Sequence, residues 1–398
     1  MRINYISRLS LFDLLIRQNA VKRNNQPKQM KVSGRDTLEI SSTAKDISIT
    51  NKVSGTSRNR KIDQSIDLQS YVEEAKKANQ SAIENAGSEI KANNADVYQD
   101  TYHAFKNALI DKYTKLAKEA RSNSNPENYI ERKYYDKTCS WYDGDLTDQE
   151  RQIAFSYERQ MLNTGTIKGV QYLDSLFRGI EVNADVVGAA RTTFNRQMVN
   201  AQIGNILKDN GIEWNESSQC TFSVDPYSYY ISVTGVNDEL KQEMETALNV
   251  GENGKNLYLH INHCATQDGA NSSQITEDGK LKYQAYHQVF DFTGLKLDKL
   301  EERDGSYYTK DGTDIRDIVD DAIENSKEVP GSHKQQMKDW IREMISRLAT
   351  KGWNNIKDMV LGIDYIGGSL IDKNQNIFFS LDNAELKRLL NSEKYLTL

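Results

Sequence analysis

Apolar residues recur at three- and four-residue spacing over several long stretches of the chain, which is the pattern of amphipathic helices. The first stretch follows Asp67 and places these residues on one face: Leu68, Tyr71, Val72, Ala75, Ala78 and Ala82. The second runs from about Ala95 to Ala120, with this face: Tyr98, Tyr102, Phe105, Leu109, Tyr113 and Leu116. A short connection containing Gly87 joins them, so the pattern predicts an antiparallel helical hairpin over residues 65–125.

The rest of the chain, residues 126–398, shows further helix patterns. Thr147 is followed by Glu150 three residues later, which is the capping-box signature of a helix start. A long helix is predicted from Ala184 to Asn210, ended by Gly211, because glycine favours the left-handed conformation that ends helices. Four more helices are predicted over 237–248, 314–325, 333–350 and 382–391.

Short strand patterns lie between these helices. Runs at 221–224 and 229–233 flank Asp225-Pro226 and predict a hairpin. Alternation of Leu257, Leu259 and Ile261 predicts a strand, and Tyr307-Tyr308 lies between two Asp-Gly turns. A last hairpin is predicted from 362–371 to 377–379. Because no βαβ rhythm appears, we predict a helix-rich α+β fold with small antiparallel sheets.

The N-terminal segment differs in composition from the remainder. Residues 19–64 are rich in Asn, Gln, Ser, Thr, Lys and Arg without sustained periodicity, which predicts a flexible tether. Together with a hinge or boundary predicted at 121–126, this divides the chain into a disordered basic arm (1–64), the helical hairpin (65–125) and an α+β body (126–398).

Charge separates the arm from the rest of the protein. Residues 1–64 contain 13 Lys/Arg against 5 Asp/Glu, a net charge of +8, whereas the remainder has 38 against 52, a net charge of -14. A basic arm can fold back on an acidic body or reach an acidic partner. The negative body would repel phosphate, so no nucleic-acid partner is expected for it.

The start of the arm has its own helical pattern. Basic residues separate four apolar residues that share a face: Ile6, Leu9, Phe12 and Ile16. The pattern favours a short helix that docks on the body or on a protein partner, and membrane-surface binding is the alternative. Charged residues interrupt the stretch and no small-residue cleavage site follows, which argues against a secretory signal.

Cysteine content and hydropathy bear on location. Cys139, Cys220 and Cys264 are odd in number and far apart, which favours a reducing compartment over a disulfide framework. No apolar run approaches the roughly 20 residues of a transmembrane helix. A cytoplasmic protein is therefore expected.

Two local segments have residue types typical of binding sites. His260, His263 and Cys264 offer zinc-ligand chemistry, but strand alternation would separate them and a fourth ligand is missing nearby, so no metal is predicted. The Gly251–Asn256 segment resembles a shortened phosphate-binding loop, yet it has too few residues between its glycines and no Ser or Thr after Lys255. It is interpreted as a helix end and turn.

Carboxylates cluster at Glu301, Glu302 and Asp304, and again at Asp317, Asp320 and Asp321. Neither set has a partner base or a calcium-loop pattern, so both are interpreted as solvated faces. No nucleophile elbow, zinc-protease helix or dinucleotide fingerprint occurs in the sequence. The sequence therefore predicts no catalytic residue and no cofactor.

One segment of the arm carries a more specific signal. Asp36-Thr37-Leu38-Glu39-Ile40-Ser41-Ser42-Thr43-Ala44-Lys45-Asp46, together with residues 55–62, resembles the middle of the flagellar anti-sigma factors of Bacillus-like bacteria. Those proteins are largely disordered and leave the cell through the flagellar export apparatus. The helices that bind the sigma factor in that family have no match here. The resemblance therefore implies an export or docking segment, with Leu38, Ile40 and Ala44 as contacts.

The body resembles a family of uncharacterised proteins of spore-forming, low-GC Gram-positive bacteria. The resemblance rests on three segments: Leu146–Arg151, Phe222–Tyr227 and Tyr308–Thr313. That family implies no activity.

These observations favour a non-enzymatic interaction protein, linked to the flagellar or a related export system through its arm. Export would then follow a non-Sec, flagellar-type route, and the expected partners are proteins, with the export machinery among them. Two alternatives remain open. One is an exported effector or toxin-like protein. The other is an enzyme of unrecognised type that uses the aromatic segment around Tyr134, Tyr135, Trp141 and Tyr142 as part of a pocket.

Overall fold

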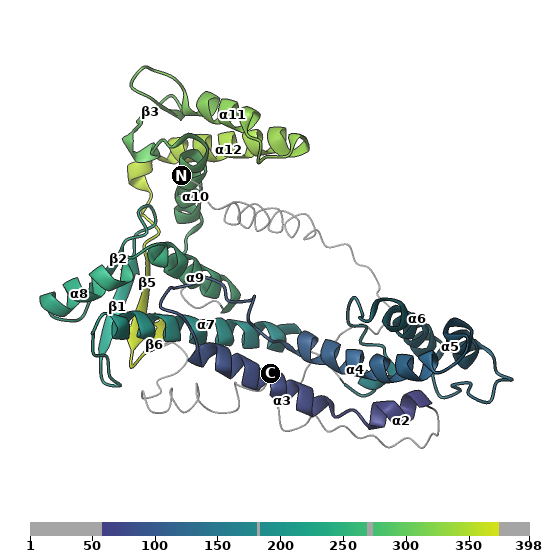
Figure 1. The fold of residues 1–398 in the computed structure, drawn as a ribbon. Coiled ribbons are helices and arrows are strands. Elements are labelled where there is room, and N and C mark those ends of the chain that lie inside the picture. The colour runs from purple at the N-terminus through teal and green to yellow at the C-terminus, as the bar shows by residue number, and fades with distance from the viewer. Residues whose placement is uncertain (1–57, 181–183, 269–273, 374–398) are drawn as a thin grey trace. The chain divides into compact units, whose positions relative to one another are not determined.

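The computed structural model of the protein describes residues 58–180, 184–268 and 274–373 (Figure 1). The predicted α+β class is confirmed, because helices predominate and the strands form small antiparallel sheets. Residues 58–180 fold into helices with these bounds: α2 (Arg58–Gln64), α3 (Leu68–Glu84), α4 (Thr101–Arg121), α5 (Pro126–Tyr135), α6 (Asp148–Thr164) and the 3-10 turn η1 (Ser175–Phe177).

Side-chain caps fix where these helices begin. Asp67 accepts a hydrogen bond from the backbone N–H of Gln69, as expected for the predicted start of α3. The capping box predicted at Thr147 and Glu150 is present at the start of α6. Such caps satisfy backbone N–H groups that have no partner within the helix, and each contributes about 1 kcal/mol.

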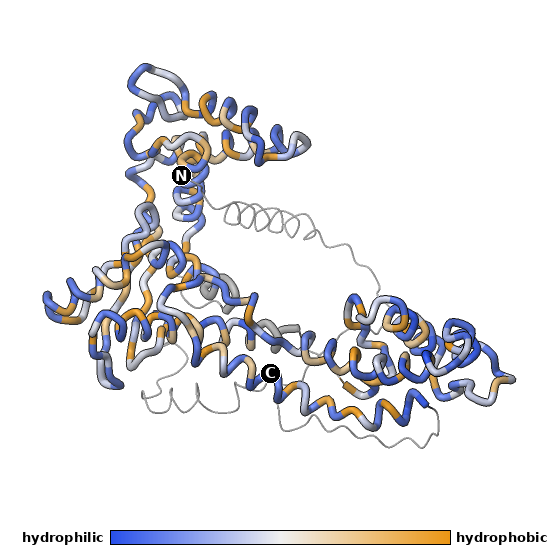
Figure 2. The backbone as a smooth tube through the Cα atoms, in the orientation of Figure 1, coloured by the Kyte–Doolittle hydropathy of each residue, from blue (hydrophilic) through white to orange (hydrophobic). Residues whose placement is uncertain are grey.

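The helices of residues 58–180 share one buried apolar cluster, to which α4 contributes the largest part. Its α4 members recur at helical spacing: Ala104, Phe105, Ala108, Leu109, Tyr113, Leu116, Ala117 and Ala120. Burying a large apolar side chain contributes about 1.5–3 kcal/mol, so this face holds α4 against α3, α5 and α6. Figure 2 shows hydrophobic and hydrophilic residues interspersed along α3 and α4, as expected for helices with one buried face.

The end of the predicted flexible tether is ordered. Residues 58–64 form helix α2, in which Asn59 is fully buried, so the tether prediction is wrong for this segment. The apolar pattern did not indicate it, because the helix has one apolar residue, Ile62, which packs on the apolar cluster around α4, while Asn59 and Asp63 add buried polar bonds. Residues 1–57 of the arm lie outside the described residues.

The connection between α3 and α4 is longer than predicted, since α4 begins at Thr101 rather than near Ala95. Residues 85–100 make up this connection, and Ile90 within it is fully buried in the core of the sheet. The side chain of Asp100 caps α4 by accepting from the N–H of His103, which explains why the helix starts there. Helix α5 is a second difference, because Pro126 begins a helix rather than a hinge.

The predicted hairpin at 221–233 is confirmed as β1 (Gln219–Val224) and β2 (Ile231–Thr234). With β5 (Leu361–Ile366) and β6 (Ser369–Asp372) they form a four-stranded antiparallel sheet in the order β2-β1-β5-β6. The sheet is accompanied by α7 (Ala184–Asp209), α8 (Asp238–Leu248) and α9 (Asn253–Asp268). Gly211, with a φ of +73°, follows α7 as predicted.

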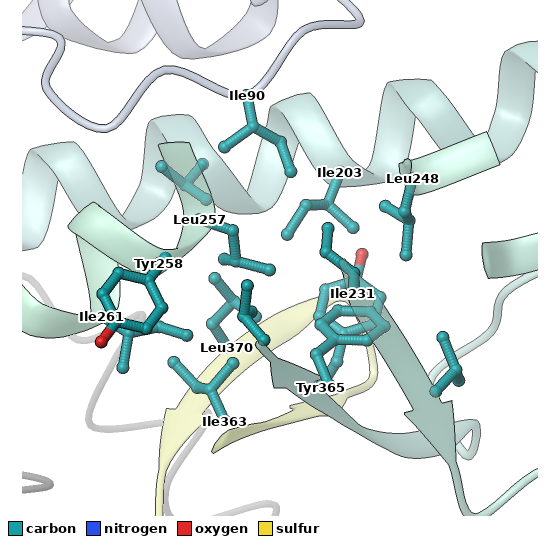
Figure 3. Close-up of a cluster of buried hydrophobic side chains, with 14 of the residues drawn as sticks. Ile90, Ile203, Ile231, Leu248, Leu257, Tyr258, Ile261, Ile363, Tyr365 and Leu370 are labelled. Atoms are coloured by element: carbon teal, nitrogen blue, oxygen red, sulfur yellow. The ribbon is translucent and has the colours of Figure 1, made fainter. Parts of the chain in front are cut away.

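One face of this sheet and the three helices form a second buried cluster. Figure 3 shows Ile203 of α7, Leu248 of α8 and Leu257 of α9 directed toward side chains of the sheet. Burial alternates along β1, where Cys220, Phe222 and Val224 are inside. Alternation in β1 and helical spacing in α7 thus converge on one core.

Residues 274–373 include three further helices and a small hairpin. The helices are α10 (Glu277–Thr293), α11 (Ile315–Asn325) and α12 (Gly331–Lys351), with 3-10 turns η3 (Leu297–Lys299) and η4 (Trp353–Asn355). The hairpin pairs β3 (Glu301–Arg303) with β4 (Ser306–Tyr308). Asp304 and Gly305 both have positive φ, which is the conformation of the tight turn predicted from this Asp-Gly pair.

Two predictions for residues 253–373 are wrong, and one helix in this range was not predicted. The segment around Leu257 and Ile261 is helical, because Leu257, Tyr258 and Ile261 also lie on one helix face. Helix α10 was missed, since tyrosines and a glycine interrupt its apolar pattern. The segment 362–371, predicted as one strand of the last hairpin, itself turns at Gly367-Gly368, both with positive φ, and forms β5 and β6. The predicted helix at 382–391 and strand at 377–379 lie outside the described residues.

Within the three described ranges, no helix combines the length and the hydropathy needed to cross a membrane.

Candidate functional site

The partner-binding residues predicted in the arm fall outside the described residues, so their role stays a prediction: Ile6, Leu9, Phe12, Ile16, Leu38, Ile40 and Ala44.

His260 lies on α9, where it is fully buried. Asn195 Nδ2 lies 3.3 Å from His260 Nδ1. Burial lowers the pKa of His260 well below its usual value, and the positive charge of Arg196 adds to the effect. The imidazole is therefore neutral and helps to join α7 to α9. The side chain of Cys264 lies outside the described part of the structure. Among the side chains that are described, no group of three His, Cys, Asp or Glu residues is placed to hold a metal ion.

The glycine-containing segment 251–256 links α8 to α9. Gly251 turns the chain with a φ of +62°, and Asn253 begins α9. The side chain of Asn253 accepts a hydrogen bond of 2.8 Å from the N–H of Ile90. The turn is as predicted, but a helix rather than a strand follows it.

The two carboxylate clusters take part in local bonds. Asp317 and Asp320 of α11 form ion pairs of 2.8 Å and 2.7 Å with Arg342 of α12. Glu302 accepts a hydrogen bond of 2.8 Å from the N–H of Trp353. The groups therefore join neighbouring elements.

The aromatic segment is a packed cluster. Tyr134 lies on α5, is fully buried and donates a hydrogen bond of 2.6 Å to Glu158 of α6. The rings of Trp141 and Tyr129 are 5.6 Å apart, and the guanidinium of Arg151 lies 4.8 Å from the Tyr142 ring. These side chains pack α5 and α6 against each other and against the loop between them.

A buried network of charged groups stands out among the described residues, and sequence reasoning missed it. Lys112 of α4 has no exposed side-chain area and lies 2.7 Å from carboxylate oxygens of both Asp63 and Asp174. Its Nζ also donates to Ser175 Oγ at 2.9 Å. Tyr113 donates to the second oxygen of Asp174. One lysine thus joins α2, α4 and η1.

A second buried group holds the first turn of α2. Asn59 donates to Asp143 Oδ2 through its backbone N–H at 3.0 Å and its side-chain Nδ2 at 2.8 Å. Asn59 Nδ2 also lies 3.2 Å from the hydroxyl of Tyr134, which is bound to the buried Lys133–Glu158 ion pair. We call the set that holds this helix the α2 anchor: Asn59, Asp63, Lys112, Asp143 and Asp174.

Burial dominates the electrostatics of the α2 anchor. It raises the pKa of Asp63, and the attraction of Lys112 only partly opposes the shift. For Lys112, burial alone would lower the pKa, but the charges of Asp174 and Asp63 raise it above 10.5. Lys112 therefore stays charged between two carboxylates. Because Asp143 binds Asn59 and Lys112 binds Asp63, the arrangement attaches α2 at two points.

A signal for the α2 anchor does exist in the sequence. Lys112 occupies a core position of α4, three residues after Leu109 and four before Leu116. Lys133 stands likewise three residues after Ile130 on α5. A lysine at a core position is rarely fully buried unless it is paired. Neither residue was recognised, because the carboxylate partners are remote in sequence.

A third feature is backbone strain at the end of the β1–β2 hairpin. Tyr229 has a φ of +59°, a conformation that costs a bulky residue about 1–3 kcal/mol. Its hydroxyl lies 2.8 Å from that of Tyr283, and its ring stacks on His287 at 5.1 Å. A Cβ on Gly254 would stand 1.8 Å from the Tyr229 carbonyl oxygen. Close packing of α9 and α10 around the hairpin thus holds the strained residue.

The fold and the α2 anchor define a helix-rich α+β protein whose first described helix is fixed by buried ion pairs. The chain belongs to the family described as "Domain of unknown function (DUF4885)", whose signature matches residues 63–386. This confirms the resemblance of the body to an uncharacterised family. The match begins at Asp63, the α2 residue that pairs with Lys112.

A curated relative agrees with this assignment. The chain is 30% identical over 300 residues to "Uncharacterized protein YbdO" of Bacillus subtilis (strain 168), covering 75% of each chain. No solved structure matches the chain.

Proposed function

We propose that this protein is a non-enzymatic interaction protein, whose N-terminal arm engages export machinery of the flagellar or a related type. The observation that carries the proposal is the α2 anchor. A seven-residue helix is too short to be stable alone, since isolated helices below about 12–15 residues are marginal in water. Buried contacts of Asn59 and Asp63 with the body therefore hold it.

The α2 anchor gives the arm a firm point of attachment. Residues 1–57 precede α2 directly, and α2 contacts α4 and η1. A partner that captures the arm would consequently hold the body through buried ion pairs. Breaking such a pair costs about 3–5 kcal/mol, because it leaves an unpaired buried charge. Such an attachment suits an arm through which a partner holds the folded body.

The state of several potentially reactive groups also supports a binding role. Burial raises the pKa of the Cys220 thiol to about 12, so the less reactive protonated form is present at neutral pH. Burial lowers the pKa of His287 to about 4, while its Nε2 bonds the carbonyl oxygen of Pro226 at 2.7 Å. Tyr227 is engaged with Asp358 at 2.7 Å. These side chains are used in packing.

A secretion assay tests the proposal in a flagellated Bacillus host. Wild-type protein is expected in the culture medium, and deletion of residues 1–50 is expected to retain it inside the cell. A host lacking the flagellar export gate should likewise retain the intact chain. The amounts inside and outside are measured by immunoblot, and circular dichroism shows whether the truncated protein is folded.

Deletion of residues 19–34 is the matched control, because it shortens the arm but keeps both predicted contact segments, 6–16 and 38–44. This variant should be secreted. Equal secretion from the gate-deficient host would disprove the flagellar route, and retention of the wild-type chain would disprove export altogether.

A further inference from the structure

A shallow groove lies between α3 and α7, apart from the α2 anchor. Two turns of each helix line it, from Lys76 to Ile83 and from Ala190 to Gln197, together with Tyr98 of the connection. Its volume is about 250 Å³, below the roughly 300–1,000 Å³ of small-molecule pockets. An open groove between two helices instead suits the apolar face of a third helix.

The floor of the groove is apolar and one rim is positive. The rings of Tyr98 and Phe194 pack at 4.8 Å, and half-buried Ile83 lies against them. Lys76 pairs with Glu73 at 2.8 Å on its own helix. Exposed Lys77 forms no ion pair with the residues that the structure describes. An occupant should therefore present apolar side chains flanked by a carboxylate.

The chain leaves the described part of the fold beside this groove. Asp372, at the end of β6, binds Arg196 of α7 with two contacts of 3.0 Å. Arg196 directly precedes Gln197, which lines the groove. The residues from Lys373 to Leu381 span at most about 30 Å when extended, whereas one helical turn is only about 5.4 Å. The segment after Leu381 is therefore within reach.

That segment has the required pattern. Leu386, Leu389 and Leu390 recur at the spacing of one helix face. Glu385 precedes Leu389 by four positions and flanks one edge of this face, Lys387 flanks the other edge, and Arg388 falls on the opposite side. The N-terminal segment 6–16 fits less well, because about 40 residues separate it from Arg58, so its docking would close a much longer loop.

We propose that residues 382–391 form an amphipathic helix that docks in the α3–α7 groove, with its leucines on Ile83, Tyr98 and Phe194 and Glu385 facing Lys77. This docking is independent of the proposed role of the arm. It would cover the apolar floor that α3 and α7 leave open.

Photo-crosslinking of the full chain tests the docking. A benzophenone amino acid replaces Gln80 at the edge of the groove, and crosslinked peptides are mapped by mass spectrometry. Crosslinks to residues 382–391 of the same chain are expected, and an isotope-labelled mixture separates them from crosslinks between copies. The same probe at exposed Val250, outside the groove, should give none of them.

A charge swap between Lys77 and Glu385 provides the specific control, since Lys77 is exposed and belongs to neither apolar cluster. Lys77→Glu is expected to lower the crosslink yield by about two- to fivefold, the range of an exposed ion pair. Glu385→Lys in the same chain should restore it. Crosslinks to residues 1–57, crosslinks only between copies, absence of crosslinks, or failure of the second substitution to restore the yield would each overturn the proposal.

Discussion

Lys112 shows how a single buried charge can organise several elements. Its ammonium group lies between Asp63 and Asp174, and Ser175 accepts a further hydrogen bond. The desolvation of three charges opposes folding, and their mutual attraction offsets it only while all three are present. The residue is thus more important for specifying the position of α2 than for net stability.

Replacing Lys112 with Met should destabilise the protein by about 3–5 kcal/mol, because two buried carboxylates lose their counter-charge. Urea denaturation followed by circular dichroism measures the change. Lys118→Met is the matched control, since Lys118 is exposed on the same helix and should change the free energy of unfolding by less than about 0.5 kcal/mol. Equal midpoints for the two variants would contradict the assigned role of Lys112.

At the scale of elements, α2 depends on contacts remote in sequence. Asn59 binds Asp143, 84 residues away, and Asp63 binds Ser175, 112 residues away. Helices held in this way are protected from proteases only while the rest of the domain is folded.

Trypsin should cleave the native chain slowly after Arg60 and Lys61, although both sites lie next to the arm. Asp143→Ala removes the acceptor of Asn59, so cleavage there should become at least about tenfold faster, matching a loss of roughly 1.4 kcal/mol or more in local stability. A time course analysed by mass spectrometry measures the rate. Glu131→Ala, at an exposed position of α5, should leave it unchanged. Equal rates in both variants would show that Asp143 does not hold α2.

Elements with local signals were predicted well, and elements that depend on distant partners were not. Asp67 and Thr147 cap their own helices, so α3 and α6 could be predicted from neighbouring residues. The pattern around Leu257 and Ile261 satisfies both strand and helix periodicity over so short a length, and only packing against α7 and the sheet decides between them. The spacing on α4 indicates that Lys112 is buried, but its partners in the α2 anchor could not be predicted, because the acids and Lys112 meet only in the folded chain.

At the scale of the whole molecule, buried tyrosines occur in both apolar clusters. Burial raises the pKa values of Tyr98, Tyr129, Tyr157 and Tyr283 to about 12. Tyr113 and Tyr134 are shifted well above 10, by burial and then by the adjacent carboxylates of Asp174 and Glu158. Because these tyrosines are buried in their neutral form, we expect high pH to destabilise all parts of the fold that contain them.

Stability should be independent of these tyrosines below pH 10 and fall as the pH rises above it. The unfolded chain loses the phenolic protons near pH 10, whereas the folded chain retains them, so the unfolded state binds fewer protons and is favoured as the pH rises. Tyrosinate absorbance and circular dichroism, recorded together, measure this. The part of the absorbance that comes from the buried tyrosines should change in one cooperative transition with the circular dichroism, and in urea the whole absorbance should titrate near pH 10. Ionisation of all tyrosines near pH 10 without unfolding would contradict this expectation.

The strand order β2-β1-β5-β6 delays completion of the sheet during protein synthesis. Thr221 of β1 bonds Asp364 of β5, which lies 143 residues later in the chain. At a synthesis rate of about 5–20 residues per second, roughly 7–30 s pass between the emergence of the two residues from a ribosome. During this interval the edge of β1 that pairs with β5 has no strand partner, and the cluster that buries Ile90 lacks its β5 and β6 residues. Each newly made molecule therefore offers an interval in which a chaperone, or a machine that threads unfolded chains, can take hold of it before its sheet closes.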